Sequence, residues 1–368
     1  MNFSHYISRT IPAIGFAALA CGGFVATATN ASADDYKIIN SSQTMGTGGI
    51  DYVTADSENR RIYVPRGNQV LVFDLDSLKQ AGAIPGLKGG HGVAVDAKSG
   101  HAFSSSNPVL MWDAKTLEQI KTIEVKGRPD GILFEPLTER IYVLSHEEPN
   151  VTVLDGKDGS IVGTIDLGGA PEQAQSDGEG HVYIDLEDKD KIAVVDAKEM
   201  KMTGSFDLAG KGGGPGGLGL DTKNKILFAF CHEPAVCVIL SAVDGKILTT
   251  LPIGNGTDGG GFNPATMEAF SSQGRDGTLT IIKEKSATEF EVEQTLQTKA
   301  GAKTCALDTK NNNIVLITVE RPPASQASAA TPGTMPPTAA GTNAPGGQRP
   351  RGGGRGGPGL LDILIVGH

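Results

Sequence analysis

A short apolar segment ending in aspartate recurs along the chain at nearly constant spacing. Four copies lie at intervals of 39, 42 and 41 residues and end at Asp74, Asp113, Asp155 and Asp196. Two further copies, 236–240 and 279–283, keep the register but lack the aspartate. A fixed period of about 40 residues is typical of repeat architectures, in which each unit packs against its neighbours. This period constrains the fold more strongly than any other feature of the sequence.

Each unit contains the same succession of segments. A Gly-rich turn such as 127–131 opens the unit, and four short strands rich in β-branched residues follow, with polar turns between them. Four strands per period of about 40 residues are typical of a propeller blade. Seven opening turns are present, near Gly48, Gly89, Gly127, Gly169, Gly212, Gly256 and Gly301. The sequence therefore predicts an all-β fold, a seven-bladed β-propeller of four-stranded blades. The Gly clusters at 212–217 and 259–261 are interpreted as tight turns, because no helix follows them as in a phosphate-binding loop.

The seventh unit is interrupted. Its second strand, 313–319, runs into a segment of Pro, Gly, Ala, Ser and Thr, and its third strand appears only at 360–366. The strand at 36–40 can supply the missing fourth strand, which would close the ring with strands from both ends of the chain. We therefore divide the chain into propeller (34–321), insertion (322–358) and final strand (359–368).

The first 33 residues resemble a secretory signal. Arg9 precedes an apolar stretch, 11–25, and small residues at 31–33 offer a cleavage site. The apolar stretch is shorter than the roughly 20 residues that span a bilayer. We expect a periplasmic or secreted protein without a transmembrane segment; an N-terminal anchor or a lipid attached to Cys21 are the alternatives.

The insertion and the overall charge bear on nucleic-acid binding. Segment 322–358 has almost nothing to bury, so we expect it to be disordered. It contains an Arg-Gly region at 349–357, a feature that can bind nucleic acid, but the chain carries a formal charge of −10. An acidic chain is not built mainly to coat nucleic acid, and we expect a flexible loop instead.

Two features of the repeat resemble a known family. The segment Arg-Ile-Tyr-Val occurs at 61–64 and again at 140–143, and the opening turns are Gly-x-x-Pro-like. The chain resembles the YVTN-repeat, YncE-like seven-bladed β-propellers of bacteria over residues 36–320 and 359–367. The resemblance implies the fold, whereas it says little about function because the family is defined mainly by its repeat. Members of that family have been associated with DNA, and similar propellers include lactonases and subunits of redox enzymes.

An alignment of the seven units selects one position per blade, just before the first strand. It is occupied by Asp51, His91, Asp130, Glu172, Gly216, Asp258 and Lys303. In a propeller these positions surround one mouth of the central channel, so they are our candidate ligand-binding residues.

Crowded carboxylates either take up protons or hold a cation. The tentative metal ligands are Asp51, Asp130, Glu172 and Asp258. Oxygen ligands favour Ca²⁺ or Mg²⁺, and His91 would admit Zn²⁺ or Mn²⁺. A solvated rim without an ion is the alternative.

Loops between second and third strands should open on the same face. They contribute His146 and His232 at matching points of two blades, together with Arg66 and Glu187. A His–Glu pair can act as a base or a metal ligand, although solvated turn residues would give the same pattern. Cys231 and Cys237 either form a disulfide across a hairpin or remain buried thiols.

These features favour an exported propeller, monomeric and non-catalytic, that binds a small molecule or a partner protein at the channel mouth. The alternative is a metal-dependent, lactonase-like hydrolase, in which a divalent ion would polarise an ester carbonyl. A third reading is a subunit that docks to a redox enzyme. Nucleophile-elbow and P-loop motifs are missing from the sequence, and fold alone does not decide function.

Overall fold

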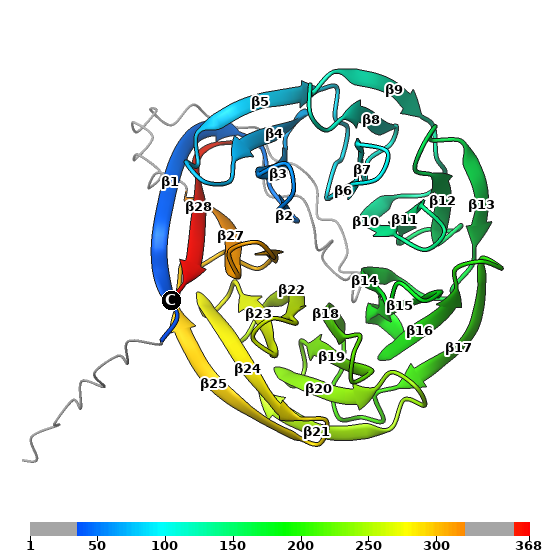
Figure 1. Ribbon diagram of the computed structural model, residues 1–368, viewed down its shortest axis with the longest axis vertical. Coiled ribbons are helices and arrows are strands. Elements are labelled where there is room, and N and C mark those ends of the chain that lie inside the picture. Colours follow the sequence, from blue (N-terminus) through cyan, green and yellow to red (C-terminus); the bar gives the residue numbers. More distant parts are fainter. Residues whose placement is uncertain (1–34, 321–356) are drawn as a thin grey trace, which may run out of the picture. The chain divides into compact units, whose positions relative to one another are not determined.

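The computed structural model describes residues 35–320 and 357–368. In these residues, 28 strands form seven four-stranded antiparallel sheets arranged around a ring (Figure 1). The seven-bladed propeller predicted from the repeat is confirmed. The predicted signal segment, 1–33, and the Arg-Gly insertion up to residue 356 lie outside the described residues.

Each blade runs from an inner strand at the channel to an outer strand at the rim (Figure 1). Blade 1 contains β2 (Thr54–Asp56), β3 (Arg61–Arg66), β4 (Gln69–Asp74) and β5 (Gln80–Pro85). Blade 2 contains β6 (Val93–Asp96), β7 (His101–Ser104), β8 (Val109–Asp113) and β9 (Gln119–Ile123). Blade 3 contains β10 (Pro129–Glu135), β11 (Arg140–Ser145), β12 (Val151–Asp155) and β13 (Ile161–Ile165). Blade 4 contains β14 (Pro171–Ser176), β15 (His181–Leu186), β16 (Lys191–Asp196) and β17 (Lys201–Asp207), with the 3₁₀ turn η1 (Glu187–Lys189) between β15 and β16.

The remaining blades follow the same order. Blade 5 contains β18 (Pro215–Asp221), β19 (Ile226–Cys231), β20 (Val236–Ser241) and β21 (Ile247–Pro252). Blade 6 contains β22 (Thr257–Asn263), β23 (Glu268–Gln273), β24 (Thr278–Ser286) and β25 (Glu289–Gln297). Blade 7 contains β26 (Cys305–Asp308), β27 (Asn313–Glu320), β28 (Pro358–Gly367) and β1 (Lys37–Thr47).

Blade 7 joins the two ends of the described chain. Its strand order is β26-β27-β28-β1, so the N-terminal strand forms the outer edge, as predicted. β1 is longer than the expected 36–40 and pairs with β28 from Lys37 opposite Gly367 to Thr47 opposite Pro358. Arg66 fastens this pair: its guanidinium donates to the carbonyl oxygens of Thr44 (3.3 Å) and Gly359 (2.8 Å).

The hydrophobic core lies between the blades. The described residues form seven buried clusters, and each cluster draws its members from two neighbouring blades. One example packs Tyr142 and Leu144 of blade 3 against Val182 and Ile184 of blade 4. A single blade exposes both faces of its sheet, so it gains its apolar burial only from its neighbours.

The aspartate that marks the repeat has a structural role. Asp113 Oδ1 accepts hydrogen bonds from the backbone N–H groups of Lys115 (2.9 Å) and Thr116 (2.7 Å). Asp155 and Asp196 make the same pattern after their own strands. This side chain therefore holds the turn between the third and fourth strands, as short polar side chains commonly do in turns.

The interpretation of the Gly clusters as tight turns is wrong for the residues that lie in strands. Gly216 and Gly217 belong to β18, and Gly259–Gly261 belong to β22. A Cβ atom on Gly217 would lie 2.7 Å from the carbonyl carbon of Gly259. These glycines allow the inner strands of blades 5 and 6 to approach backbone to backbone, a contact that any side chain would prevent.

Candidate functional site

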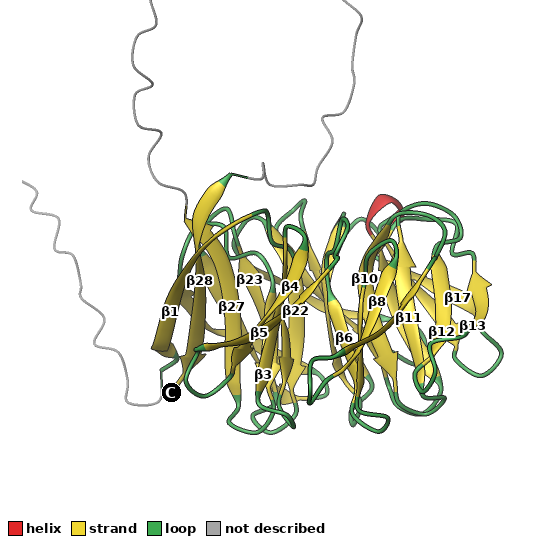
Figure 2. Cartoon of the chain, turned by 90° about the horizontal axis from the view of Figure 1, so that it is seen from above, coloured by secondary structure: helices red, strands yellow, loops and turns green. Residues whose placement is uncertain are grey.

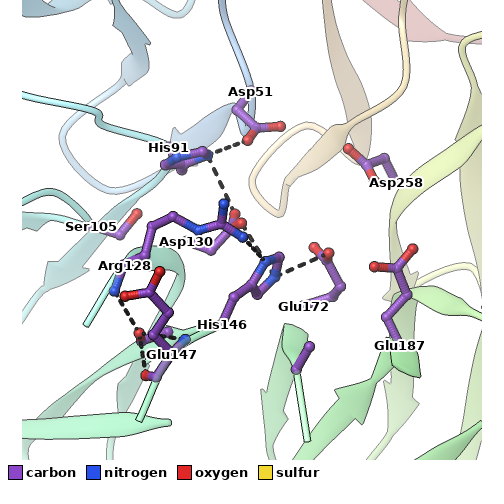
Figure 3. Close-up of polar contacts among 12 residues, drawn as sticks. Asp51, His91, Ser105, Arg128, Asp130, His146, Glu147, Glu172, Glu187 and Asp258 are labelled. Atoms are coloured by element: carbon purple, nitrogen blue, oxygen red, sulfur yellow. Dashed lines mark hydrogen bonds and ion pairs between the residues drawn. The ribbon is translucent and has the colours of Figure 1, made fainter. Parts of the chain in front are cut away.

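The inner strands begin, and the loops between second and third strands turn, at the same mouth of the channel. Figure 2 shows the strands running between two faces, with η1 on one of them. Figure 3 shows that face from close range: carboxylates and imidazoles from several blades point toward one another. The position selected by the repeat alignment therefore does bring side chains of different blades together.

One half of the mouth is organised by an ammonium group. Lys303 Nζ lies 2.7 Å from Asp51 Oδ1 and also bonds Asp258 Oδ2. The other oxygen of Asp51 lies 2.5 Å from His91 Nδ1. Asp51 is thus held between a lysine and an imidazole, and Asp258 has the lysine as its cationic partner.

The other half is organised by two imidazoles around one carboxylate. Asp130 Oδ1 lies 3.4 Å from His91 Nδ1, and Asp130 Oδ2 lies 3.3 Å from His146 Nε2. His146 Nε2 also lies 3.2 Å from Glu172 Oε1 (Figure 3). Tyr52 donates its phenolic hydrogen to the second oxygen of Glu172 at 3.0 Å. Acidic and cation-forming groups therefore alternate along the mouth from Asp258 to Glu172.

The carboxylates outnumber the permanent cations in this network, and burial makes their charge costly. Burial, followed by the charges of Asp130 and Asp258, raises the pKa of Glu172 to about 7. Burial also raises the pKa values of Asp130 and Asp258. For Lys303, burial alone would lower the pKa, but the carboxylates of Asp258 and Asp51 outweigh it and raise the value. A bound cation would therefore relieve the repulsion among these carboxylates.

His232 does not join this network in the way that its match to His146 suggested. The ring position of blade 5 is Gly216, and a Cβ atom there would lie 2.8 Å from His232 Nε2. The imidazole of His232 therefore packs over Gly216. In blade 3 the same ring position is Asp130, whose carboxylate meets the imidazole of His146. The nearest carboxylate oxygen in a salt bridge to it belongs to Glu187, at 3.8 Å. The two histidines share a loop position but have different partners.

The four carboxylates predicted as metal ligands do not form one group. Asp51 and Asp258 are joined through Lys303. The two three-residue groups whose ligand atoms lie within 4.8 Å of one another each include an imidazole, and they share Asp130: one with Asp51 and His91, the other with His146 and Glu172. These two groups are found among the residues that the structure describes. An oxygen-only site is therefore not what the geometry offers.

Sequence reasoning missed several residues of the mouth. Tyr52 directly follows the aligned ring position, and an aromatic residue there could have indicated a channel-facing hydroxyl. Arg128 lies exposed at the mouth, with Nη2 at 3.0 Å from His146 Nδ1. Gln173 follows Glu172 and bridges to blades 5 and 6, donating to Gly260 O at 2.8 Å and accepting from Leu218 N at 2.9 Å. Nothing in the repeat pattern indicated these two residues.

Two other expectations are settled by geometry. Arg66 is 2% exposed and serves the closure of blade 7, so its expected place at the mouth is wrong. Cys231 and Cys237 are buried free thiols and form no disulfide. Burial raises the pKa of both thiols, which keeps them protonated and poorly nucleophilic.

Below the mouth, the channel contains a cavity of about 420 Å³. Its walls are formed by inner-strand residues of several blades, among them Tyr52, Glu172, Gln173 and Phe262. Glu172 and Tyr52 therefore lie between the mouth and the cavity. A ligand that enters from this face meets the charged network first.

The described residues contain no helix that is long and apolar enough to cross a membrane. No protein-family model matches the chain, and no curated protein matches it. Among solved structures, the chain is similar to the RRP9 WD40 repeats, with a TM-score of 0.63 and 12% identity over 77% of this chain and 89% of that one. It is also similar to the U3-55K structure, with a TM-score of 0.63 and 12% identity over 77% of this chain and 90% of that one. At this identity the similarity shows the fold alone: the chain is a seven-bladed β-propeller.

Proposed function

We propose that the protein is an exported, YncE-like propeller that binds a positively charged group of a partner protein or small molecule at the channel mouth, without catalysis. The observation that carries the proposal is the charged network at the mouth. Four carboxylates from four blades converge there, with Lys303 as the permanent cation placed between two of them. A site with this excess of acidic groups attracts cations.

Two further observations support binding over catalysis. The groups in the mouth network are carboxylates, imidazoles, an ammonium, a guanidinium and a phenol, and the buried thiols of Cys231 and Cys237 lie outside it. Propellers with WD40 repeats share the fold, and a rigid ring of blades is a suitable scaffold for a binding surface.

The direct test is calorimetry with two peptides of equal length, one rich in lysine and one rich in glutamate. We expect the lysine peptide to bind, with an affinity that falls as salt rises. The double variant Asp258→Asn/Glu172→Gln should weaken binding about 10-fold or more, and the exposed Glu118→Gln serves as control. Equal binding of both peptides, or an affinity unchanged in the double variant, would contradict the proposal.

A metal-dependent hydrolase remains the second candidate function. The group of Asp130, His146 and Glu172 favours it, because a divalent ion among these residues could polarise a carbonyl. Hydrolysis of simple lactones that depends on added divalent ion and is lost in Glu172→Gln would favour the hydrolase. If the wild-type protein hydrolyses lactones no faster than Glu172→Gln, the hydrolase is refuted and binding remains the proposed function.

A further inference from the structure

The group of Asp130, His146 and Glu172 has the spacing of metal ligands. His146 Nε2 lies 3.3 Å from Asp130 Oδ2 and 3.2 Å from Glu172 Oε1. Around a tetrahedral ion with bonds of about 2.0–2.2 Å, neighbouring ligand atoms are roughly 3.3–3.6 Å apart. The two separations from His146 Nε2 are close to the edges of such a tetrahedron, and the ligand atoms of the three residues all lie within 4.8 Å of one another.

The imidazole nitrogen at the centre of this group faces two carboxylates at once. His146 Nε2 is buried between Asp130 Oδ2 and Glu172 Oε1, and it makes no well-aligned hydrogen bond with either oxygen. A single hydrogen on Nε2 cannot point at both oxygens, and buried polar atoms are nearly always well paired in folded proteins. A cation between the three atoms would contact the nitrogen and both oxygens at once.

Neighbouring residues orient the two carboxylates toward this position. Tyr52 donates to Glu172 Oε2, which leaves Oε1 directed at His146. Asp130 meets His91 with one oxygen and His146 with the other. Hydrogen bonds of this kind fix the ligands of metal sites in proteins. On the opposite side, Lys303 already occupies the space between Asp51 and Asp258.

We propose that Asp130, His146 and Glu172 bind one divalent transition-metal ion of the Zn²⁺ class, with the fourth position open to the channel mouth. One imidazole and two carboxylates suit Zn²⁺, Co²⁺ or Mn²⁺ better than Ca²⁺ or Mg²⁺, which prefer oxygen ligands alone. The inference rests on the proposed function, because it names a cation that the mouth accepts. It replaces the oxygen-only ligand set expected from the sequence.

Arg128 gives the site a competing state. Its Nη2 lies 3.0 Å from His146 Nδ1, and a guanidinium can only donate, so Nδ1 accepts in this contact. A neutral imidazole that binds metal through Nε2 carries its proton on Nδ1. Metal binding and the Arg128 contact therefore exclude each other, and the exposed arginine must move away when the ion binds.

The experiment is calorimetric titration of the full chain, with any purification tag removed, using Zn²⁺ and in parallel Ca²⁺. We expect one Zn²⁺ per chain and much weaker binding of Ca²⁺. His146→Gln and Glu172→Gln should each weaken Zn²⁺ binding by about 100-fold, because each removes a ligand. Circular dichroism and thermal unfolding establish that each variant is folded.

The repeat supplies matched controls. His232→Gln changes the equivalent loop residue, which pairs with Glu187 instead of Asp130 and Glu172, and Glu118→Gln removes an exposed carboxylate away from the mouth. Both should keep the Zn²⁺ affinity within about 3-fold. Arg128→Gln should strengthen Zn²⁺ binding. The control Lys126→Gln removes a positive charge close by in the sequence and should have a smaller effect.

Three results would overturn the inference: no Zn²⁺ bound, an equal loss in His232→Gln and His146→Gln, or a site that prefers Ca²⁺ and needs Asp258. The lysine-peptide titration separates this failure from that of the proposed function. A protein that binds the peptide but no Zn²⁺ refutes the metal site alone. A protein that binds neither refutes both.

Discussion

At the scale of single residues, the repeat signature serves the packing between blades. Tyr142 of the Arg-Ile-Tyr-Val segment donates its hydroxyl hydrogen to Ala197 O in the next blade at 3.2 Å, and Arg140 donates to the same oxygen at 2.8 Å. Tyr183 makes the equivalent bond to Ala242 O at 3.0 Å. The residues that reveal the fold are therefore distinct from those at the mouth, which is why the signature carries so little information about function.

This difference gives a stability prediction. Tyr183→Phe leaves Ala242 O without its side-chain donor, and we expect the free energy of unfolding to fall by about 1–2 kcal/mol. Tyr142→Phe should cost less, because Arg140 still donates to Ala197 O. Urea unfolding of both variants measures the two values. Equal losses of unfolding free energy in the two variants would show that Arg140 does not compensate for the missing hydroxyl of Tyr142.

Asp185 is the residue that most clearly breaks the repeat. It occupies the place of Leu144 in blade 3 and Phe230 in blade 5, is 0% exposed, and neither carboxylate oxygen has a hydrogen-bond partner. Burial, followed by the charge of Glu172, raises its pKa well above the usual value. We therefore expect the folded protein to keep a proton on Asp185 that the unfolded chain releases above about pH 4.

Stability should accordingly fall as the pH rises. Below the unfolded pKa both states are protonated and nothing is lost, whereas at higher pH folding requires proton uptake, at up to about 1.4 kcal/mol per pH unit. Asp185→Asn removes this dependence, so its stability relative to wild type should grow from pH 4 to pH 8. Thermal unfolding across this range measures the effect, with the exposed Glu118→Gln as control. A constant difference between variant and wild type would show that Asp185 does not take up a proton on folding.

At the scale of elements, the closure of blade 7 depends on β1 and β28, which come from opposite ends of the chain. Arg66 of blade 1 donates to both strands, through Thr44 O and Gly359 O. Tyr36 also donates its hydroxyl hydrogen to Glu268 of blade 6 at 2.5 Å. These contacts fix the outer strand of the closing blade, which otherwise presents a largely exposed face.

We expect Arg66→Met to loosen this closure, because it keeps the apolar stem and removes both donors. Amide hydrogen exchange in β1 and β28 should become faster, and unfolding stability should fall by about 1–3 kcal/mol. Arg61→Met, a partly exposed neighbour on β3, should leave exchange in β1 unchanged. Unchanged exchange in the Arg66 variant would place the closing contacts elsewhere.

Element positions were more predictable from sequence than side-chain partners. The period of about 40 residues predicted the blades, their strand order and the N-terminal strand in blade 7, because hydrophobic alternation and turns are local features. It also predicted that ring positions of different blades, such as Asp51 and His91, lie close together. It did not predict that Lys303 would bind both Asp51 and Asp258, that His146 and His232 would have different partners, or that Gly217 and Gly259 would be in contact. Those outcomes depend on distances between blades, which a single sequence does not contain.

At the scale of the whole molecule, the ring of blades places residues far apart in sequence at one mouth. Asp51 and Lys303 meet from the two ends of the described chain, and Asp130, His146 and Glu172 meet from blades 3 and 4. The cores between blades hold the scaffold, so the mouth residues are free to serve binding. For cation binding, the convergence that matters is that of Asp130, His146 and Glu172, which we propose to form one site.

Anomalous scattering at the zinc edge, from crystals soaked in dilute Zn²⁺, tests this site because it locates the ion. We predict one strong peak within bonding distance of Asp130, His146 and Glu172, absent from crystals of His146→Gln. A mouth without a peak, or peaks only at exposed surface residues, would show that these three residues do not bind the ion.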